Sequence, residues 1–243
     1  MKKLLVVGLG PGSPEQMTIE AAHALESADI LCGYTGYIDL IRDRYPGKEL
    51  LSTPMKRELE RCRLALEQAE KGQTVAMVCS GDAGVYGMAG PILELAPQFP
   101  QVEIEIVPGV SAAMSGGALL GAPLGHDFAV ISLSDLLTPW ELIEHRLQAA
   151  AQGDFAICLY NPASRKRADY LARACDILLD TLPSDRLCAV TRNIGREGEQ
   201  GRLLTLQELR EFPADMFTTV FIGNSQTRKV AGRMVTPRGY LEP

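Results

Sequence analysis

Turns that combine glycine with one polar side chain follow several short apolar runs, and these turns are the residues best suited to binding a small molecule. The apolar run at residues 75–79 ends in Ser80-Gly-Asp-Ala-Gly-Val-Tyr-Gly87, where Asp82 is the single carboxylate. Glycine lets backbone amides and carbonyls approach a ligand that a Cβ atom would keep away. From these residues alone, a structural turn in which Asp82 caps the following helix is an equally good interpretation.

Two more turns of this kind precede and follow it. Residues 4–7 run into Gly8-Leu-Gly-Pro-Gly12, and the alternating run at residues 102–107 leads to Pro108-Gly-Val-Ser111, where Ser111 is placed to cap a small-residue helix. Ligands of parallel sheets bind beyond the carboxyl ends of the strands, so three such turns predict a ligand cleft. The glycine spacing does not fit a dinucleotide fingerprint, and no Lys-Ser or Lys-Thr pair completes a P-loop.

The elements that must position these turns alternate between strand and helix. In the first half, helices are predicted at residues 18–28, 58–71, 89–96 and 112–120. Strands are predicted there at 4–7, 29–33, 75–79 and 102–107. In the second half, strands at 128–133, 154–160, 186–191 and 217–222 are separated by helices at 139–151 and up to 182. This pattern predicts an α/β fold, with a boundary in the glycine-rich stretch near residue 121.

Charge and cysteine usage exclude several classes of protein. The 243-residue chain has a net charge of -6, which argues against general nucleic-acid binding. No apolar run approaches the roughly 20 residues that cross a bilayer, so we expect a cytoplasmic protein without a membrane partner. The 6 cysteines are scattered without Cys-x-x-Cys spacing, which predicts neither a disulfide framework nor a metal site.

A cationic cluster begins the helix predicted at 58–71. Lys56, Arg57, Arg61 and Arg63 lie within two turns, beside the apolar positions Leu59, Leu64, Leu66 and Ala69. Such a cluster either binds an anionic ligand or is a solvated helix face. The loop expected at residues 33–37 also has two interpretations, because Tyr34 and Tyr37 could line a pocket or simply pack a turn.

The three glycine turns, in this order and spacing, resemble those of the tetrapyrrole (corrin/porphyrin) methylases, which are S-adenosylmethionine (SAM) enzymes. Four further blocks are similar to the precorrin-3B C17-methyltransferase branch of cobalamin biosynthesis. They are Gly33-Tyr-Thr-Gly-Tyr37, Ile131-Ser-Leu-Ser-Asp-Leu-Leu-Thr-Pro-Trp140, Tyr160-Asn-Pro-Ala-Ser164 and Thr236-Pro-Arg-Gly-Tyr240. The resemblance extends over essentially the whole chain.

The resemblance implies a fold of two α/β domains, residues 1–121 with a mainly parallel sheet and residues 122–243 with a mixed sheet and flanking helices. SAM would bind in the cleft between them, and the protein would be a cytoplasmic homodimer. The implied reaction methylates carbon 17 of precorrin-3B, or of its cobalt form, and contracts the macrocycle. The alternatives are a related methyltransferase with another substrate, or a non-catalytic module that binds SAM or a nucleotide.

Site residues also follow from the resemblance. The implied SAM contacts are Pro11, Ser80, Gly81, Asp82, Val85, Ser111, Ala112, Asn161 and Ile194. Gly10, Arg57 and Arg61 would bind the tetrapyrrole, with the two arginines gripping macrocycle carboxylates. Many relatives have a glycine where this chain has Ser80, and an apolar residue where it has Asn161.

Proton transfer during ring contraction needs an acid or a base, and Ser134 beside Asp135 offers a hydroxyl and a carboxylate after a strand. Tyr34 is the third residue of the predicted catalytic set. A competing interpretation is that Asp135 or Thr138 only caps the helix that begins near Pro139.

Overall fold

The structure is a computed structural model that describes residues 2–164 and 167–240. The chain forms two compact units, residues 1–111 and 112–243. This division falls 10 residues before the boundary predicted at 121. The reason is that α5 (Ala112–Leu120) packs on strands of the second unit, where a Cβ atom added to Gly116 would lie 3.0 Å from the Phe221 ring.

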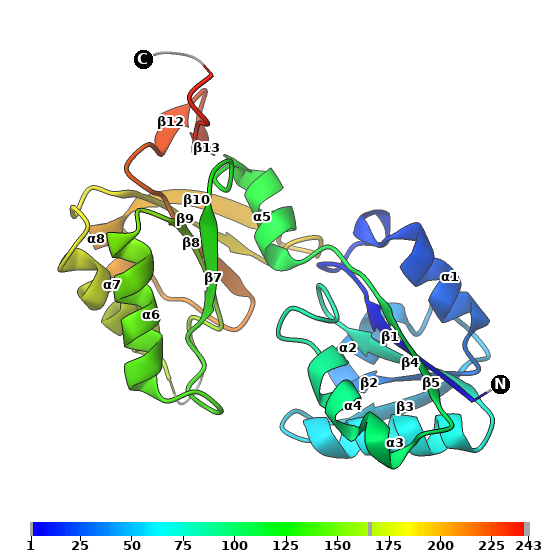
Figure 1. Ribbon diagram of the computed structural model, residues 1–243. Coiled ribbons are helices and arrows are strands. Elements are labelled where there is room, and N and C mark those ends of the chain that lie inside the picture. Colours follow the sequence, from blue (N-terminus) through cyan, green and yellow to red (C-terminus); the bar gives the residue numbers. More distant parts are fainter. Residues whose placement is uncertain (1, 165–166, 241–243) are drawn as a thin grey trace. The chain divides into compact units, whose positions relative to one another are not determined.

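The first unit is a five-stranded parallel sheet with the order β3-β2-β4-β1-β5. Its strands are β1 (Lys3–Gly8), β2 (Ile30–Tyr34), β3 (Glu49–Thr53), β4 (Thr74–Cys79) and β5 (Glu103–Val107). The connections contain α1 (Ile19–Ser27), α2 (Thr35–Ile41), α3 (Glu58–Glu70), α4 (Ala89–Leu95) and two 3-10 turns, Pro14–Gln16 and Ala96–Gln98. Because β4, β1 and β5 are adjacent and parallel, their three glycine turns lie at one edge of the sheet (Figure 1).

Helices cover both faces of this sheet, and the apolar strand residues alternate between the two cores. In β1, Leu4 and Val6 join one core with residues of α3 and α4. Leu5 and Val7 join the other core with residues of α1 and α2. A strand that is buried on both faces has a continuous apolar sequence, as residues 4–7 do.

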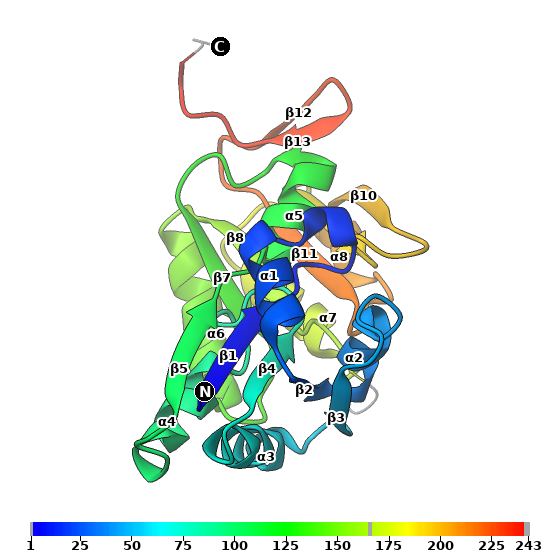
Figure 2. The same ribbon diagram turned by 90° about the vertical axis from the view of Figure 1, so that its right-hand side faces the viewer.

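The second unit contains a mixed five-stranded sheet with the order β10-β9-β11-β8-β7, in which only β7 and β8 are parallel. Its strands are β7 (Phe128–Ser132), β8 (Ala156–Tyr160), β9 (Leu187–Arg192), β10 (Gln200–Thr205) and β11 (Thr218–Ile222). The helices α6 (Trp140–Gln152), α7 (Tyr170–Leu179) and α8 (Leu206–Arg210) share one core, and α5 packs against the opposite face (Figure 2).

The predicted fold class is confirmed, with a parallel sheet in the first half and a mixed sheet in the second. Some elements differ from the predictions. Residues 33–37 are not a loop, because Gly33 and Tyr34 end β2 and α2 starts at Thr35. Strand β3 was not predicted. Neither was the hairpin of β12 (Arg228–Val230) and β13 (Arg233–Val235), which pairs with β6 (Gly121–Ala122). Over the described ranges, no helix is long and apolar enough to cross a membrane.

Candidate active site

The first two glycine turns are joined by main-chain hydrogen bonds. The Gly10 amide donates to the Gly81 carbonyl at 3.0 Å, and the Gly81 amide donates to the Gly10 carbonyl at 2.7 Å. Both glycines have positive φ, 76° at Gly10 and 69° at Gly81, a conformation that side chains other than glycine rarely adopt. The turns after β1 and β4 therefore form one continuous backbone surface.

The third turn closes on the same point with no room for side chains. A Cβ atom added to Gly8 would lie 2.7 Å from both the Gly109 amide nitrogen and the Gly81 carbonyl oxygen. A Cβ atom added to Gly109 would approach the Gly81 carbonyl even more closely. Separations below 3.0 Å cannot be accommodated without moving the backbone, so the contact of the three turns requires glycine at both positions.

Asp82 fixes this arrangement with its carboxylate. One oxygen accepts from the Gly109 amide at 2.9 Å, and the other accepts from the Gly84 amide at 2.8 Å. Asp82 thus links the turn after β4 to the turn after β5. It does not cap α4, because the N-cap residue of that helix is Met88. The carboxylate is used to hold the loops, so we assign Asp82 a positioning role.

The remaining SAM contacts predicted in the first unit lie in or directly after the same three turns. Val85 is 38 % exposed, whereas Gly10 and Pro11 are buried. Ser80, Gly81, Asp82 and Ser111 are half-buried. Ser80, Gly81, Asp82, Val85 and Ser111 are therefore partly accessible at these turns.

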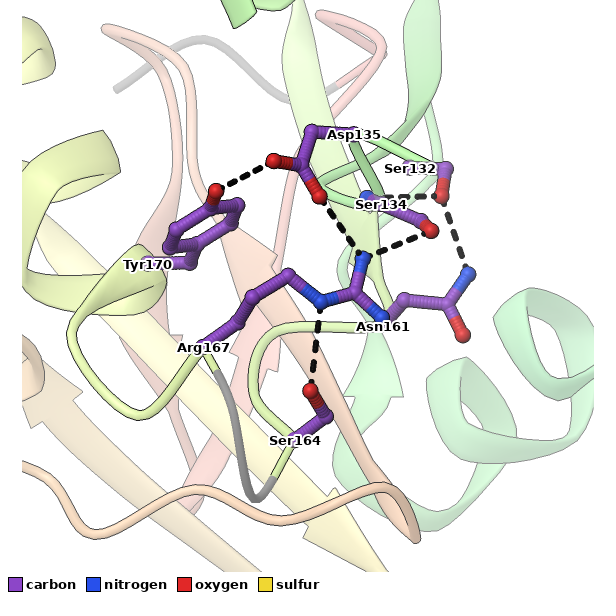
Figure 3. A network of polar contacts seen from close by, with 7 residues as sticks. All are labelled: Ser132, Ser134, Asp135, Asn161, Ser164, Arg167 and Tyr170. Carbon is purple, nitrogen blue, oxygen red and sulfur yellow. Dashed lines mark hydrogen bonds and ion pairs between the residues drawn. The ribbon is translucent and has the colours of Figure 1, made fainter. Parts of the chain in front are cut away.

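A second polar cluster lies in the second unit, where β7 and β8 end (Figure 3). The Ser132 hydroxyl accepts from the Ser134 amide at 3.2 Å and from the Asn161 side-chain amide at 2.9 Å. The backbones at Ser164 and Arg167 pair with each other, which holds Arg167 beside the turn after β8. The turns after these parallel strands are therefore joined through side chains.

Arg167 is the centre of this cluster (Figure 3). Its Nε donates to the Ser164 hydroxyl at 3.1 Å, and one terminal nitrogen donates to Ser134 Oγ at 2.7 Å and to Asp135 Oδ1 at 3.3 Å. The Tyr170 hydroxyl donates to the second oxygen of Asp135. The Tyr170 hydrogen bond, followed by the charge of Arg167, lowers the pKa of Asp135. The same bond raises the pKa of Tyr170.

Neither Asp135 nor Thr138 caps the next helix. α6 begins at Trp140, its N-cap residue is Pro139, and no side chain caps it. Both carboxylate oxygens of Asp135 instead face donors from the segment after β8. This geometry removes the helix-cap interpretation and leaves Asp135 as part of the Arg167 cluster.

Residues 3–210 match the family of Tetrapyrrole (Corrin/Porphyrin) Methylases. The chain belongs to this family. The methylase is 48 % identical to the "Probable cobalt-factor III C(17)-methyltransferase" of Salmonella typhimurium, over 98 % of this chain and 99 % of that protein. It is 42 % identical to a "Precorrin-3B C(17)-methyltransferase" of Sinorhizobium sp, over 98 % and 96 % of the two chains.

Solved structures agree with the fold of this methylase. The crystal structure of the methyltransferase CobJ superimposes with a TM-score of 0.89 at 39 % identity, covering 96 % of this chain and 99 % of that one. A uroporphyrin-III C-methyl transferase from Thermus thermophilus, complexed with S-adenosyl homocysteine, has a TM-score of 0.69. At 21 % identity, that likeness concerns the fold alone, and it covers 91 % and 97 % of the two chains.

The arginines predicted to bind substrate in this tetrapyrrole methylase have different environments. Arg61 is only 4 % exposed. Its Nε donates to Thr53 Oγ1 at 2.9 Å and a terminal nitrogen donates to the Pro54 carbonyl at 3.1 Å. Arg57 precedes α3, is exposed and forms an ion pair with Glu60. The two side chains therefore do not form a paired grip, and Arg61 is positioned to tie α3 to β3.

Other predicted residues lie outside the two clusters or at their edges. Tyr34 is half-buried at the end of β2, with its ring edge-to-face with Tyr37 at 5.1 Å. Ile194 is buried after β9, beside Gly116 of α5. Ala112 is the first residue of α5. In the described ranges, no group of His, Cys, Asp and Glu residues could hold a metal ion.

Arg167 and Tyr170 were not predicted as site residues. The available signal was their position, because both follow the turn Tyr160-Asn-Pro-Ala-Ser164 that ends a predicted strand. The contact between this segment and Ser134-Asp135 depends on β7 and β8 being neighbours in the sheet. Sequence order does not specify that pairing.

Proposed function

We propose that this chain is a SAM-dependent methyltransferase that methylates carbon 17 of precorrin-3B, or of cobalt-factor III, with contraction of the macrocycle. The observation that carries the proposal is 48 % identity over nearly the full length of a relative with that named activity. The convergent glycine turns of residues 1–111 supply a site for the methyl donor. The reaction would be a step of cobalamin biosynthesis.

SAM, when bound, supplies an activated methyl group, so the protein contributes alignment and exclusion of water. Gly81 and Gly10 present closely approached backbone, and Asp82 keeps the turns in place through the Gly84 and Gly109 amides. Pro11, Ser80, Val85, Ser111 and Ala112 complete the proposed donor site in and beside the same turns. Asn161 and Ile194 remain predicted contacts on the basis of the family resemblance.

Ser134 is the better candidate for moving a proton within the Arg167 cluster. A serine hydroxyl that accepts a hydrogen bond from a guanidinium still has its own proton to donate. Polarisation by the Arg167 charge makes that hydroxyl a stronger donor. The lowered pKa of Asp135 makes the carboxylate a weak base, so its role is to hold Arg167 and Tyr170. Tyr34 remains a proposed member of the catalytic set.

The cellular location and the oligomeric state are proposed from the family resemblance, because the names of the relatives do not give them. We place the enzyme in the cytoplasm and propose a homodimer. The cobalt-containing substrate is the first choice, since the relative with the higher identity is named for cobalt-factor III and the precorrin-3B relative is 42 % identical. The alternative is a methyltransferase of the same family with a different tetrapyrrole.

The test is a direct assay with both substrates. The purified chain is incubated with SAM labelled in its methyl group and with cobalt-factor III or precorrin-3B, and products are analysed by mass and absorbance. We expect one labelled methyl group and the absorbance change of a contracted ring with at least one substrate. Methylation of another tetrapyrrole only would favour the alternative, and binding of SAM without turnover on any of them would indicate a non-catalytic module.

A further inference from the structure

We infer that Arg167 is the anchor for a substrate carboxylate in the second unit. The inference rests on the proposed function, and it names the residue that contacts the anionic rim of the tetrapyrrole. Arg61 is buried and bonded within its own unit, so it is not available for this role. Arg57 is exposed and paired with Glu60, and Arg167 offers a second, better held cation for the substrate.

The guanidinium of Arg167 is held in place by neighbours on two sides (Figure 3). Nε and one terminal nitrogen donate to Ser164, Ser134 and Asp135. Within residues 2–164 and 167–240, no hydrogen-bond partner accepts from the other terminal nitrogen. An arginine oriented in this way offers two N–H donors without losing much side-chain entropy on binding.

Exposure and charge also suit an anion at this position. The Arg167 side chain is 18 % exposed, so it is accessible but largely removed from water, where charge-assisted hydrogen bonds are stronger. Asp135 balances one positive charge, and its oxygens already accept from two donors. Arg173 adds a second guanidinium, 5.1 Å from the centre of the Tyr170 ring and 4.0 Å from that of Trp140. Arg167 and Arg173 therefore both lie beside the Tyr170 ring, which places two guanidinium groups at this position.

The surface next to the cluster suits the body of the same ligand. Leu136 and Leu137 directly follow Asp135 and are 64 % and 98 % exposed. Adjacent exposed leucines are unfavourable in water and mark a contact surface when they adjoin directed polar groups. A ligand with a broad apolar ring and peripheral carboxylates matches both features. We therefore assign the Arg167 nitrogen that has no acceptor among the described residues to a macrocycle carboxylate.

The test compares Arg167→Gln and Arg167→Lys with Arg228→Gln, an exposed arginine on β12 of the same unit. Cobalt-factor III binding is measured by absorbance titration and SAM binding by calorimetry, after thermal melting shows each variant to be folded. We expect Arg167→Gln to weaken tetrapyrrole binding about ten- to a hundredfold, which is the loss of one charge-assisted bond. SAM affinity should be unchanged, Arg167→Lys should lose less, and the control should match wild type.

A methyl-esterified cobalt-factor III separates a carboxylate contact from a shape effect. Wild type and Arg167→Gln should bind the ester equally, because its carboxylates have lost their charge. Equal affinity of the two proteins for the free acid would overturn the Arg167 assignment while leaving the methyltransferase proposal intact. A wild-type chain that binds and converts no tetrapyrrole would overturn both. If Arg167→Gln does not fold, Arg167→Lys decides the question. Weaker binding of the free acid with unchanged binding of the ester would support the anchor. Unchanged binding of the free acid and of the ester would contradict it.

Discussion

The Asp82 carboxylate accepts a hydrogen bond from the Gly109 amide at 2.9 Å, across 27 residues of sequence. This bond joins the turn after β4 to the turn after β5, while Gly10 and Gly81 join the turns after β1 and β4. One acidic side chain and one pair of glycine backbones thus shape the proposed donor site. The site's stability and its ligand affinity should respond together to changes here.

Asp82→Ala should reduce both the stability of the protein and its affinity for SAM. It leaves the Gly84 and Gly109 amides without their acceptor, and a hydrogen bond to a charged group contributes about 1.5–3 kcal/mol when buried and less at a half-buried site. We expect about 1–3 kcal/mol lower stability in urea unfolding and at least tenfold weaker SAM binding by calorimetry. Asp82→Asn, which keeps one acceptor oxygen, should lose less of each. Full SAM affinity in the alanine variant would contradict the positioning role.

Gly109→Ala should damage the donor site through sterics alone. The new Cβ atom would meet the Gly81 carbonyl and Gly8. Gly90→Ala is the matched control, because a Cβ atom at this position meets nothing within 4 Å. Gly90 lies in helix α4, where alanine is favoured over glycine by up to about 1 kcal/mol. The two changes should shift the melting temperature in opposite directions. Only Gly109→Ala should abolish SAM binding.

Arg61→Ala should act on folding. It removes the donors to Thr53 and Pro54 from a buried position, which we expect to cost roughly 2–4 kcal/mol in denaturant unfolding. Arg57→Ala, which loses only an exposed ion pair, should change stability by less than about 1 kcal/mol. A stable Arg61→Ala protein with selectively impaired tetrapyrrole binding would restore Arg61 as a substrate ligand.

The Asp135–Tyr170 bond should stabilise the fold in a predictable range of pH. The folded-state pKa of Asp135 is lower than the ordinary value of about 3.9, so its contribution is complete above about pH 4 and is lost as pH falls through the folded pKa. The difference in unfolding free energy between wild type and Tyr170→Phe should therefore be constant from about pH 5 to 8 and shrink below about pH 4. The exposed Tyr240→Phe should show no such dependence.

The cysteines should be unreactive in the folded protein. All 6 are buried, and burial raises the pKa of Cys62 to about 11 and of Cys32 to about 12. Because the thiolate is the reactive form, a thiol reagent at pH 8 should modify few cysteines until denaturant is added. Rapid labelling of the native protein at a rate independent of denaturant would show that the burial is incomplete.

Strand periodicity and turn composition predicted much of the first half of the chain. The helix at residues 112–120 has the predicted bounds, and the turns after β1, β4 and β5 converge as expected for adjacent parallel strands. Convergence follows from sheet topology, so it requires no knowledge of individual side chains. The hairpin at residues 228–235 was missed because its strands are three residues long and rich in basic side chains.

The face of α3 shows where sequence interpretation was wrong. Leu59 was assigned to the apolar face, but it is 62 % exposed. The buried stripe contains Arg61, Cys62, Ala65, Leu66 and Ala69. Small residues at helical spacing marked the true face, and a buried arginine among them was counted as part of a charge cluster. Leu59 is more hydrophobic than Cys62, but the helix buries the side of α3 whose side chains fit against the sheet.

The contact of Gly8 and Gly109 with the Gly81 carbonyl has a consequence for sequence variation in this chain. What the contact requires at positions 8 and 109 is the absence of atoms, so no chemical property of a replacement can compensate for its size. In a library that samples every amino acid along the three turns, these two positions should reject all alternatives equally. Neighbouring positions such as 80 and 85 should accept some substitutions and reject others according to polarity and shape. The positions that accept none would then identify the residues of the backbone contact.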